Sequence, residues 1–179
     1  MPSGSLQSFP PVYRSDARIL ILGSMPGKAS LRAAHYYAHP RNAFWRIMAA
    51  LYDVDADAEF LARYQTLMDH RVALWDVLRS CVRYSSLDSD IIESSIVPND
   101  IPGLLSACPD IQLVCFNGAK AEQAFRRYVL QDIAEPPQLL RLPSTSPAHA
   151  AMPFQQKLDA WREITSAAQA LATDESHSV

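Results

Sequence analysis

Long apolar runs and paired cysteines are both missing from this sequence. No apolar run approaches the roughly 20 residues that a membrane-spanning helix needs, and the first residues lack the apolar core of a secretion signal. The only cysteines are Cys81, Cys108 and Cys115, and no CxxC spacing joins them, so neither a disulfide framework nor a cysteine-based zinc or iron–sulfur site is supported. We therefore expect a cytoplasmic protein with free thiols, no metal and no membrane contact.

Acidic residues are absent from two long stretches, although the net charge of the chain is −3. Residues 17–52 contain no Asp or Glu but several basic residues, and residues 136–158 repeat this pattern with Arg141 and Lys157. A polyanion could approach such a face of an otherwise acidic protein. Solvated charges also cluster by chance, however, so charge alone leaves both interpretations open.

The length of 179 residues, 49% of them apolar, suffices for one domain around a single core, and no Gly/Ser-rich linker divides the chain. Residues 1–16 are polar and contain prolines, so we expect a mobile N-terminal segment there. Residues 17–172 should form the domain. Residues 173–179 lack an apolar period and are expected to be a disordered tail.

Four short apolar segments predict the strands of a mainly parallel sheet. They are residues 18–23, 72–75, 111–118 and 138–143. Elsewhere apolar residues recur at helical spacing, notably within residues 44–51, 60–67, 101–105, 118–130 and 153–171. Strands that alternate with helices predict an α/β fold. Such sheets carry their sites beyond the carboxyl ends of the strands, so the loops that follow the strands are the informative ones.

The first of these loops has the sequence GSMPGKAS, residues 23–30. Gly23 and Gly27 allow a sharp turn that brings backbone amides close to a ligand, and Pro26 stiffens that turn. The spacing fits neither a nucleophile elbow nor a phosphate-binding Walker loop. An ordinary strand-to-helix turn is the simpler explanation when the segment is taken alone.

The segment HYYAHPRNAFW, residues 35–45, concentrates aromatic, histidine and amide side chains in an acid-free stretch. The His39–Pro40 pair favours an extended backbone, and Asn42 then stands at the N-cap position of the next helix. Each residue also has a structural explanation, as a cap, a lid on the core or a loop histidine. Their combination with the nearby glycine turn favours a site for a flat, uncharged heterocycle rather than for a metal or a peptide.

Together these segments resemble a known enzyme family. The Gly-x-x-Pro-Gly turn and the aromatic-Ala-His-Pro-x-Asn-x-Phe-Trp segment are similar to the mismatch-specific uracil/thymine glycosylases of the uracil-DNA glycosylase superfamily. The serine of GSMPG, the double tyrosine, LWDVL, SLDS, FNGAKA and LPSTSPA are more similar still to the hypoxanthine-DNA (deoxyinosine) glycosylase branch. The resemblance covers about residues 18–161 and implies a three-layer α/β/α sandwich. It further implies a monomeric enzyme without metal or cofactor, which cleaves the N-glycosidic bond of deaminated bases in DNA.

The resemblance also assigns roles to residues by their position in the motifs. Tyr37 stands where the superfamily has its base-stacking aromatic residue, and Asn42 matches the catalytic asparagine of the hypoxanthine branch. Asn117 falls in a motif that reads the base or supports the pocket. The loop that enters the minor groove and supports the gap left by the extruded nucleotide corresponds to Ser144, Thr145 and Ser146.

Two departures from the family pattern shape the expected mechanism. Met25 occupies the place of an acid or amide that positions water in many relatives, and Leu142 occupies the place of a catalytic histidine. Neither side chain can do that work. Orientation of the substrate and stabilisation of the departing base can still lower the barrier, and we expect Asn42 and the backbone amides of Ser24 and Met25 to provide them.

The remaining candidates have less support. His39 is a base-binding candidate, although a histidine beside a proline in a tight loop is more often structural. Ser86 and Asp88 of SLDS either cap a helix or border the pocket, and the cap is the preferred interpretation. Candidate phosphate contacts are the basic residues Lys28, Arg41 and Arg141.

The leading hypothesis is a monofunctional DNA glycosylase for hypoxanthine, and also for uracil, that extrudes the target nucleotide and initiates base excision repair. The alternative is a binding module that recognises damaged nucleic acid without cutting it. A small-molecule hydrolase is a third hypothesis, but the sequence assembles no Ser–His–acid pattern.

Overall fold

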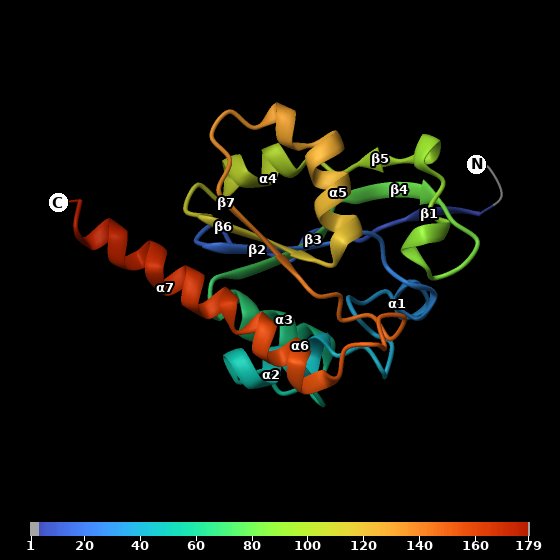
Figure 1. Cartoon of the computed structure of the whole chain (residues 1–179), viewed down its shortest axis with the longest axis horizontal. Helices are drawn as coiled ribbons and strands as arrows, with labels where there is room; N and C mark the ends of the chain where they lie inside the picture. The colour runs from blue at the N-terminus through green and yellow to red at the C-terminus, as the bar shows by residue number, and fades with distance from the viewer. Residues whose placement is uncertain (1–3, 179) are drawn as a thin grey trace.

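A computed structural model describes residues 4–178 of the chain. Its centre is a four-stranded parallel sheet with the strand order β3-β2-β6-β7 (Figure 1). These strands are β2 (Ile19–Gly23), β3 (Val72–Asp76), β6 (Leu113–Asn117) and β7 (Gln138–Leu142). An antiparallel sheet with the order β1-β4-β5 lies beside it, built from β1 (Ser5–Gln7), β4 (Leu78–Val82) and β5 (Val97–Pro98). The predicted parallel sheet is therefore confirmed.

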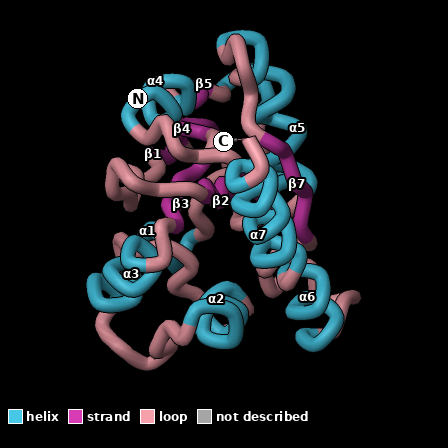
Figure 2. The backbone as a smooth tube through the Cα atoms, turned by 90° about the vertical axis from the view of Figure 1, so that its left-hand side faces the viewer, coloured by secondary structure: helices cyan, strands magenta, loops and turns pink. Residues whose placement is uncertain are grey.

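Helices cover both faces of the parallel sheet, so the predicted three-layer α/β/α sandwich is confirmed as well. One face carries α2 (Phe44–Tyr52), α3 (Phe60–Asp69), α6 (Phe154–Trp161) and α7 (Glu163–Ser176). The other face carries α4 (Ile101–Ala107) and α5 (Ala119–Tyr128) (Figures 1 and 2). The short α1 (Lys28–Ala33) follows β2, and single 3₁₀ turns cover Asp88–Asp90, Glu93–Ser95 and Leu130–Asp132.

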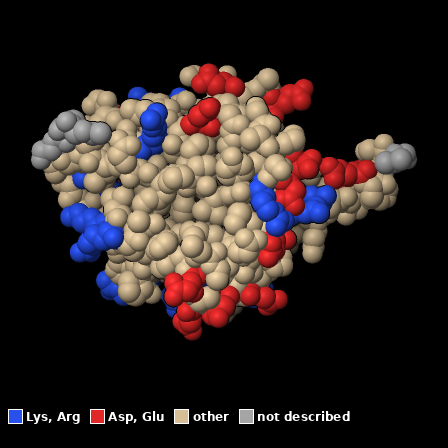
Figure 3. Space-filling model, turned by 180° about the vertical axis from the view of Figure 1, so that it is seen from behind, with Lys and Arg blue, Asp and Glu red and all other residues tan. Residues whose placement is uncertain are grey.

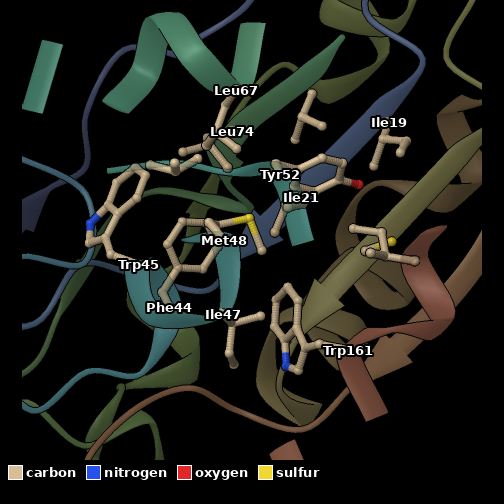
Figure 4. Close-up of a cluster of buried hydrophobic side chains, with 14 of the residues drawn as sticks. Ile19, Ile21, Phe44, Trp45, Ile47, Met48, Tyr52, Leu67, Leu74 and Trp161 are labelled. Atoms are coloured by element: carbon tan, nitrogen blue, oxygen red, sulfur yellow. The ribbon is translucent and has the colours of Figure 1, made fainter. Parts of the chain in front are cut away.

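Alternate residues of β2 face opposite layers, as the pleat of a strand requires. Ile19 and Ile21 belong to the cluster under α2 and α6, and Leu20 and Leu22 belong to the cluster under α4 and α5. Figure 4 shows the first cluster, in which aromatic residues of α2 and α6 lie beside the aliphatic residues of β2. Burial of both faces is what makes this strand continuously apolar, and it explains why the sequence predicts a parallel sheet.

Regular structure extends into both segments that flank the predicted domain. β1 pairs with β4, with Leu6 opposite Cys81, and Val12 forms an isolated bridge with Leu74. The apolar side chains of this segment pack on the core clusters and hold residues 4–16 on the domain. At the other end α7 continues to Ser176, into the predicted tail. Residues 1–3 and 179 lie outside the described part of the chain.

Candidate active site

A cavity of about 610 Å³ opens at the carboxyl ends of the parallel strands. The register explains its position, because β2 and β3 end level with each other at the Gly23–Asp76 pair. The lining comes from parts of residues 23–30, 36–42, 86–89 and 144–149, and from the strand ends Asp76 and Asn117. The predicted site residues that border this cavity are Ser24, Met25, Lys28, Tyr37, His39, Arg41, Asn42, Asn117, Ser144, Thr145 and Ser146.

Gly23 is needed at the floor of the cavity, because other groups approach its Cα closely. A Cβ built there would lie 2.4 Å from Asp76 Oδ1 and 3.0 Å from the Tyr37 hydroxyl. The carbonyl oxygens of Gly23 and Ser24 accept hydrogen bonds from backbone N–H groups just after β3, at 2.8 and 3.1 Å. Within residues 4–178, no group accepts a hydrogen bond from the backbone N–H of Ser24 or Met25. Both amides are therefore available to a bound molecule.

The ring of Tyr37 stacks on Phe44, with 4.0 Å between the centroids and 25° between the planes. This contact fixes the ring at the edge of the cavity, where its other face can meet a ligand. The backbone of Tyr37 is left-handed, with φ 53°, which is uncommon for a residue with a side chain and requires support from its surroundings. Burial raises the pKa of the Tyr37 hydroxyl, so the phenol is neutral.

The sequence predicts Asn42 as the N-cap residue of the next helix, but the N-cap lies one residue later. The helix α2 begins at Phe44 and its N-cap residue is Ala43, but Asn42 Oδ1 still accepts a hydrogen bond from the Phe44 N–H at 3.0 Å. The Nδ2 group stays available to the cavity. His39 is held in a similar way, because its Nδ1 accepts a hydrogen bond from the Arg41 N–H at 3.0 Å. A neutral His39 ring then carries its proton on Nε2.

Asn117 and Thr145 hold the loop after β7 in place. Asn117 Nδ2 donates a hydrogen bond to Thr145 Oγ1, and Asn117 Oδ1 accepts one from the Thr145 N–H, both at 2.9 Å. The Thr145 carbonyl accepts a further bond, at 3.0 Å, from the N–H of Ala43. Of the two roles predicted for Asn117, these bonds favour support of the pocket over reading of a base. Ser144 and Ser146 stay partly exposed at the cavity edge.

Two of the three predicted phosphate contacts border the cavity. Lys28 and Arg41 are exposed there, and neither forms an ion pair with any residue of the described chain. Arg141 lies on β7 outside the cavity, with its Nε 3.7 Å from the Glu122 carboxylate. On the face in Figure 3, acidic side chains gather along the lower edge, at the top and along α7, and basic ones lie both at the end away from the tip of α7 and beside the base of that helix.

Two carboxyl groups border the site, of which sequence reasoning missed Asp76 and preferred the wrong role for Asp88. Asp76 ends β3 with 3% of its surface exposed, and burial, assisted by nearby Asp88, raises its pKa to about 7. Asp88 accepts a hydrogen bond of 2.7 Å from the Ser24 hydroxyl and borders the cavity, so its preferred interpretation as a helix cap is wrong. Burial raises the pKa of Asp88 too. The signal for Asp76 was its place directly after an apolar strand.

The remaining expectations concern chemical groups that the site lacks. Leu142 is buried at the end of β7 and packs in the core, and Met25 is buried beside the cavity. Within residues 4–178, no cluster of three or more His, Cys, Asp or Glu side chains is arranged to hold a metal ion. The same part of the chain contains no helix that is long and apolar enough to cross a membrane.

Comparison with known proteins points to one family. The model of the uracil DNA glycosylase superfamily matches residues 10–167. Hypoxanthine DNA glycosylases of Methanosarcina acetivorans and Methanosarcina barkeri are 40% and 37% identical to the chain over 116 residues, which are 64% of this chain and 72% of each relative. A solution NMR structure of a candidate uracil DNA glycosylase from Methanosarcina acetivorans superposes with a TM-score of 0.73 at 32% identity, over 90% of this chain and 99% of that one.

Proposed function

The chain belongs to the uracil DNA glycosylase superfamily, and we propose that it is a monofunctional DNA glycosylase that hydrolyses the N-glycosidic bond of hypoxanthine, and also of uracil, in DNA. The observation that carries this proposal is the convergence of Tyr37, Asn42 and the amides of Ser24 and Met25 on one cavity. The cavity volume lies within the range of small-ligand pockets, which is roughly 300–1,000 Å³. Its lining offers a stacking surface and neutral donors, as a flat lactam ring requires.

Such a cavity is reached only by a base that has left the DNA stack. Extrusion costs a few kcal/mol and costs less for a mispaired base, which favours deaminated bases before any bond is broken. We assign Lys28 and Arg41 to the phosphates beside the extruded nucleotide. We assign the loop with Ser144, Thr145 and Ser146 to the gap that remains in the duplex, because the hydrogen bonds between Asn117 and Thr145 hold this loop next to the cavity.

We assign the central role in the chemistry to Asn42. Its Oδ1 is bound to the backbone of α2, so its Nδ2 can donate to the base or to the attacking water in a fixed orientation. The amides of Ser24 and Met25 would donate to the oxygen of the leaving base. Donors that are already aimed at developing charge need no reorganisation, and removal of one such donor typically costs about 10²–10³-fold in rate.

A non-catalytic module that binds damaged nucleic acid is the second candidate. It is favoured by the two buried, non-polar residues Met25 and Leu142, which stand where relatives carry catalytic groups. A duplex with one deoxyinosine, incubated with the protein and then with alkali, separates the candidates. Strand breaks at the deoxyinosine support the glycosylase, and retention of the duplex without breaks supports the module. The same assay with deoxyuridine, deoxyxanthosine and thymine mismatches defines the base preference.

We further propose that the protein works as a monomer in the cytoplasm. The buried thiols of Cys81, Cys108 and Cys115 are free, as a reducing compartment would keep them. Light scattering tests the oligomeric state, and a molar mass of one chain is the expected result.

A further inference from the structure

Asp76 is a buried group at the cavity to which the proposed function assigns no role. Its residue is 3% exposed, and its Oδ2 atom forms no hydrogen bond with any described residue. It nevertheless borders the cavity, at the floor beside Gly23. A buried carboxyl group without a partner costs stability, so its presence in the binding cavity calls for a functional explanation.

The charges around Asp76 act in opposite directions on its ionisation. Asp88 on the loop above disfavours the ionised form, whereas Arg83, just after β4, favours it. The Arg83 guanidinium donates hydrogen bonds of 2.6 Å from Nε and Nη2 to the carbonyls of Ser85 and Pro26, and its buried Nη1 forms no hydrogen bond with any described residue. Burial outweighs both charges and raises the pKa of Asp76 to about 7. The other titratable or charged residues that border the cavity are Lys28, Tyr36, Tyr37, His39, Arg41 and His149.

We propose that Asp76 is the acid that donates a proton to the base as it leaves the sugar. This inference rests on the proposed function, because it names a group that acts within that reaction. A neutral carboxyl group offers an O–H, and hypoxanthine and uracil both present carbonyl oxygens or ring nitrogens that accept it. Such assistance acts on the leaving group, so it lowers the barrier without a group that activates water at the positions of Met25 and Leu142.

Both the electron pair of the broken bond and the Asp76 proton end on the base. The bond between sugar C1′ and the base nitrogen breaks, and its electron pair passes to the base. The Asp76 proton moves to an acceptor atom of the base, which leaves neutral, and Asp76 becomes a carboxylate. The oxygen of a water molecule bonds to C1′ and releases one proton to solvent. Solvent then returns a proton to Asp76, and the enzyme is ready for another substrate.

The variant Asp76→Asn tests this role, because it keeps the shape of the side chain and removes the transferable proton. On a duplex with one deoxyinosine, the single-turnover rate of the wild type is expected to fall about tenfold per pH unit above about pH 7. The variant should be about 10²-fold slower at about pH 6 and independent of pH up to about pH 8. Because His39 remains in the variant, a flat profile assigns the titration to Asp76.

Binding is measured separately, on a duplex with 2′-fluoro-2′-deoxyinosine, whose fluorine slows cleavage. The variant should bind this duplex within about threefold of the wild type, because only the chemical step has lost its acid. An equal loss of affinity and rate would overturn the proposal, and so would a variant with the wild-type rate. A wild-type rate that does not fall above about pH 7 would overturn it even if the variant did not fold.

The matched control is Asp53→Asn, which changes an exposed carboxyl group in the left-handed residue after α2. It should keep the wild-type rate and pH profile. A wild type that releases no hypoxanthine at any pH would contradict the proposed function itself. A wild type that cuts, combined with an unchanged Asp76→Asn, would contradict only the role of Asp76.

Discussion

At the scale of single residues, the cavity uses side chains that have one atom bound to the scaffold and another atom left available. Asn42 is bound through Oδ1 and His39 through Nδ1, each to a backbone N–H close by in the chain. Tyr37 is bound through one face of its ring, which stacks on Phe44. The second atom or face is thereby aimed before any ligand arrives, which is the arrangement that catalysis by fixed neutral donors requires.

The buried carboxyl of Asp76 predicts how stability depends on pH. Its pKa is raised from 3.8 to about 7 in the folded chain, so the folded state holds this proton more tightly than the unfolded state does. The associated stability is fully present below about pH 4 and is lost as pH rises through about 7. Asp76→Asn should therefore gain stability relative to the wild type between about pH 5 and 8, by a few kcal/mol at most. Urea unfolding of both proteins across this range tests it, and parallel curves would contradict the shift.

Most residues at the cavity were predictable because each stands in a recognisable motif, as Tyr37 and Asn42 do. Asp76 was not predictable, because only burial distinguishes its carboxyl group. That burial depends on how distant loops of the chain pack around the cavity. The same holds for Asp88, where the choice between cap and pocket depended on a hydrogen bond to Ser24, a residue 64 positions away in the chain. Arg141, predicted as a phosphate contact, lies on β7 outside the cavity and beside Glu122, so its contact with DNA stays a prediction.

At the scale of elements, the strands and long helices were predictable because both faces of the sheet are buried and the apolar periods are regular. The N-terminal strand was missed because a strand of three residues shows too little alternation to recognise. Its position depends on pairing with β4, some 75 residues later, which no local pattern reveals. The site itself is assembled from loops, and their positions depend on side-chain bonds such as the one between Asn117 and Thr145.

Loss of the Asn117 amide should loosen the loop after β7. Asn117→Ala removes both bonds to Thr145 and leaves buried polar groups without partners, which costs about 1–3 kcal/mol for each such group. We expect a lower urea midpoint with an unchanged m-value, together with weaker binding to damaged duplex. Ser95→Ala is the comparison, because the Ser95 hydroxyl is also bound to backbone, at Val82 and Ile92, but Ser95 does not border the cavity. Equal losses of DNA binding in both variants would contradict a specific role for the loop.

At the scale of the whole molecule, an acidic protein presents its cavity beside unpaired cations. The chain carries a net charge of −3, while the exposed cations Lys28 and Arg41 stand at the cavity edge, and the two acids that line the cavity, Asp76 and Asp88, are buried or half-buried with raised pKa values. These exposed cations allow a polyanion to approach the site despite the overall charge. The acid-free stretches of the sequence therefore do contribute exposed cations to the cavity edge. Contact of these cations with DNA belongs to the proposed function.

Binding of duplex DNA should depend on salt through these two residues. Replacement of Lys28 and Arg41 by Ala is expected to reduce the slope of log affinity against log salt by about 1 for each phosphate that is no longer neutralised. The control is Arg127→Ala, since Arg127 is exposed and lies 3.7 Å from the Glu93 carboxylate, away from the cavity. An unchanged slope in the Lys28/Arg41 double variant would place the DNA elsewhere on the molecule.

The most direct test of the account is the single-turnover release of hypoxanthine by Asn42→Asp. This variant keeps an oxygen that accepts the Phe44 N–H, so α2 and the thermal midpoint should be preserved, and it replaces the neutral amide donor by a carboxylate that can only accept. We predict a rate at least about 10²-fold below that of the wild type on duplex DNA with one deoxyinosine. A folded Asn42→Asp protein that releases hypoxanthine at the wild-type rate would contradict the claim that neutral donors in this cavity carry the reaction.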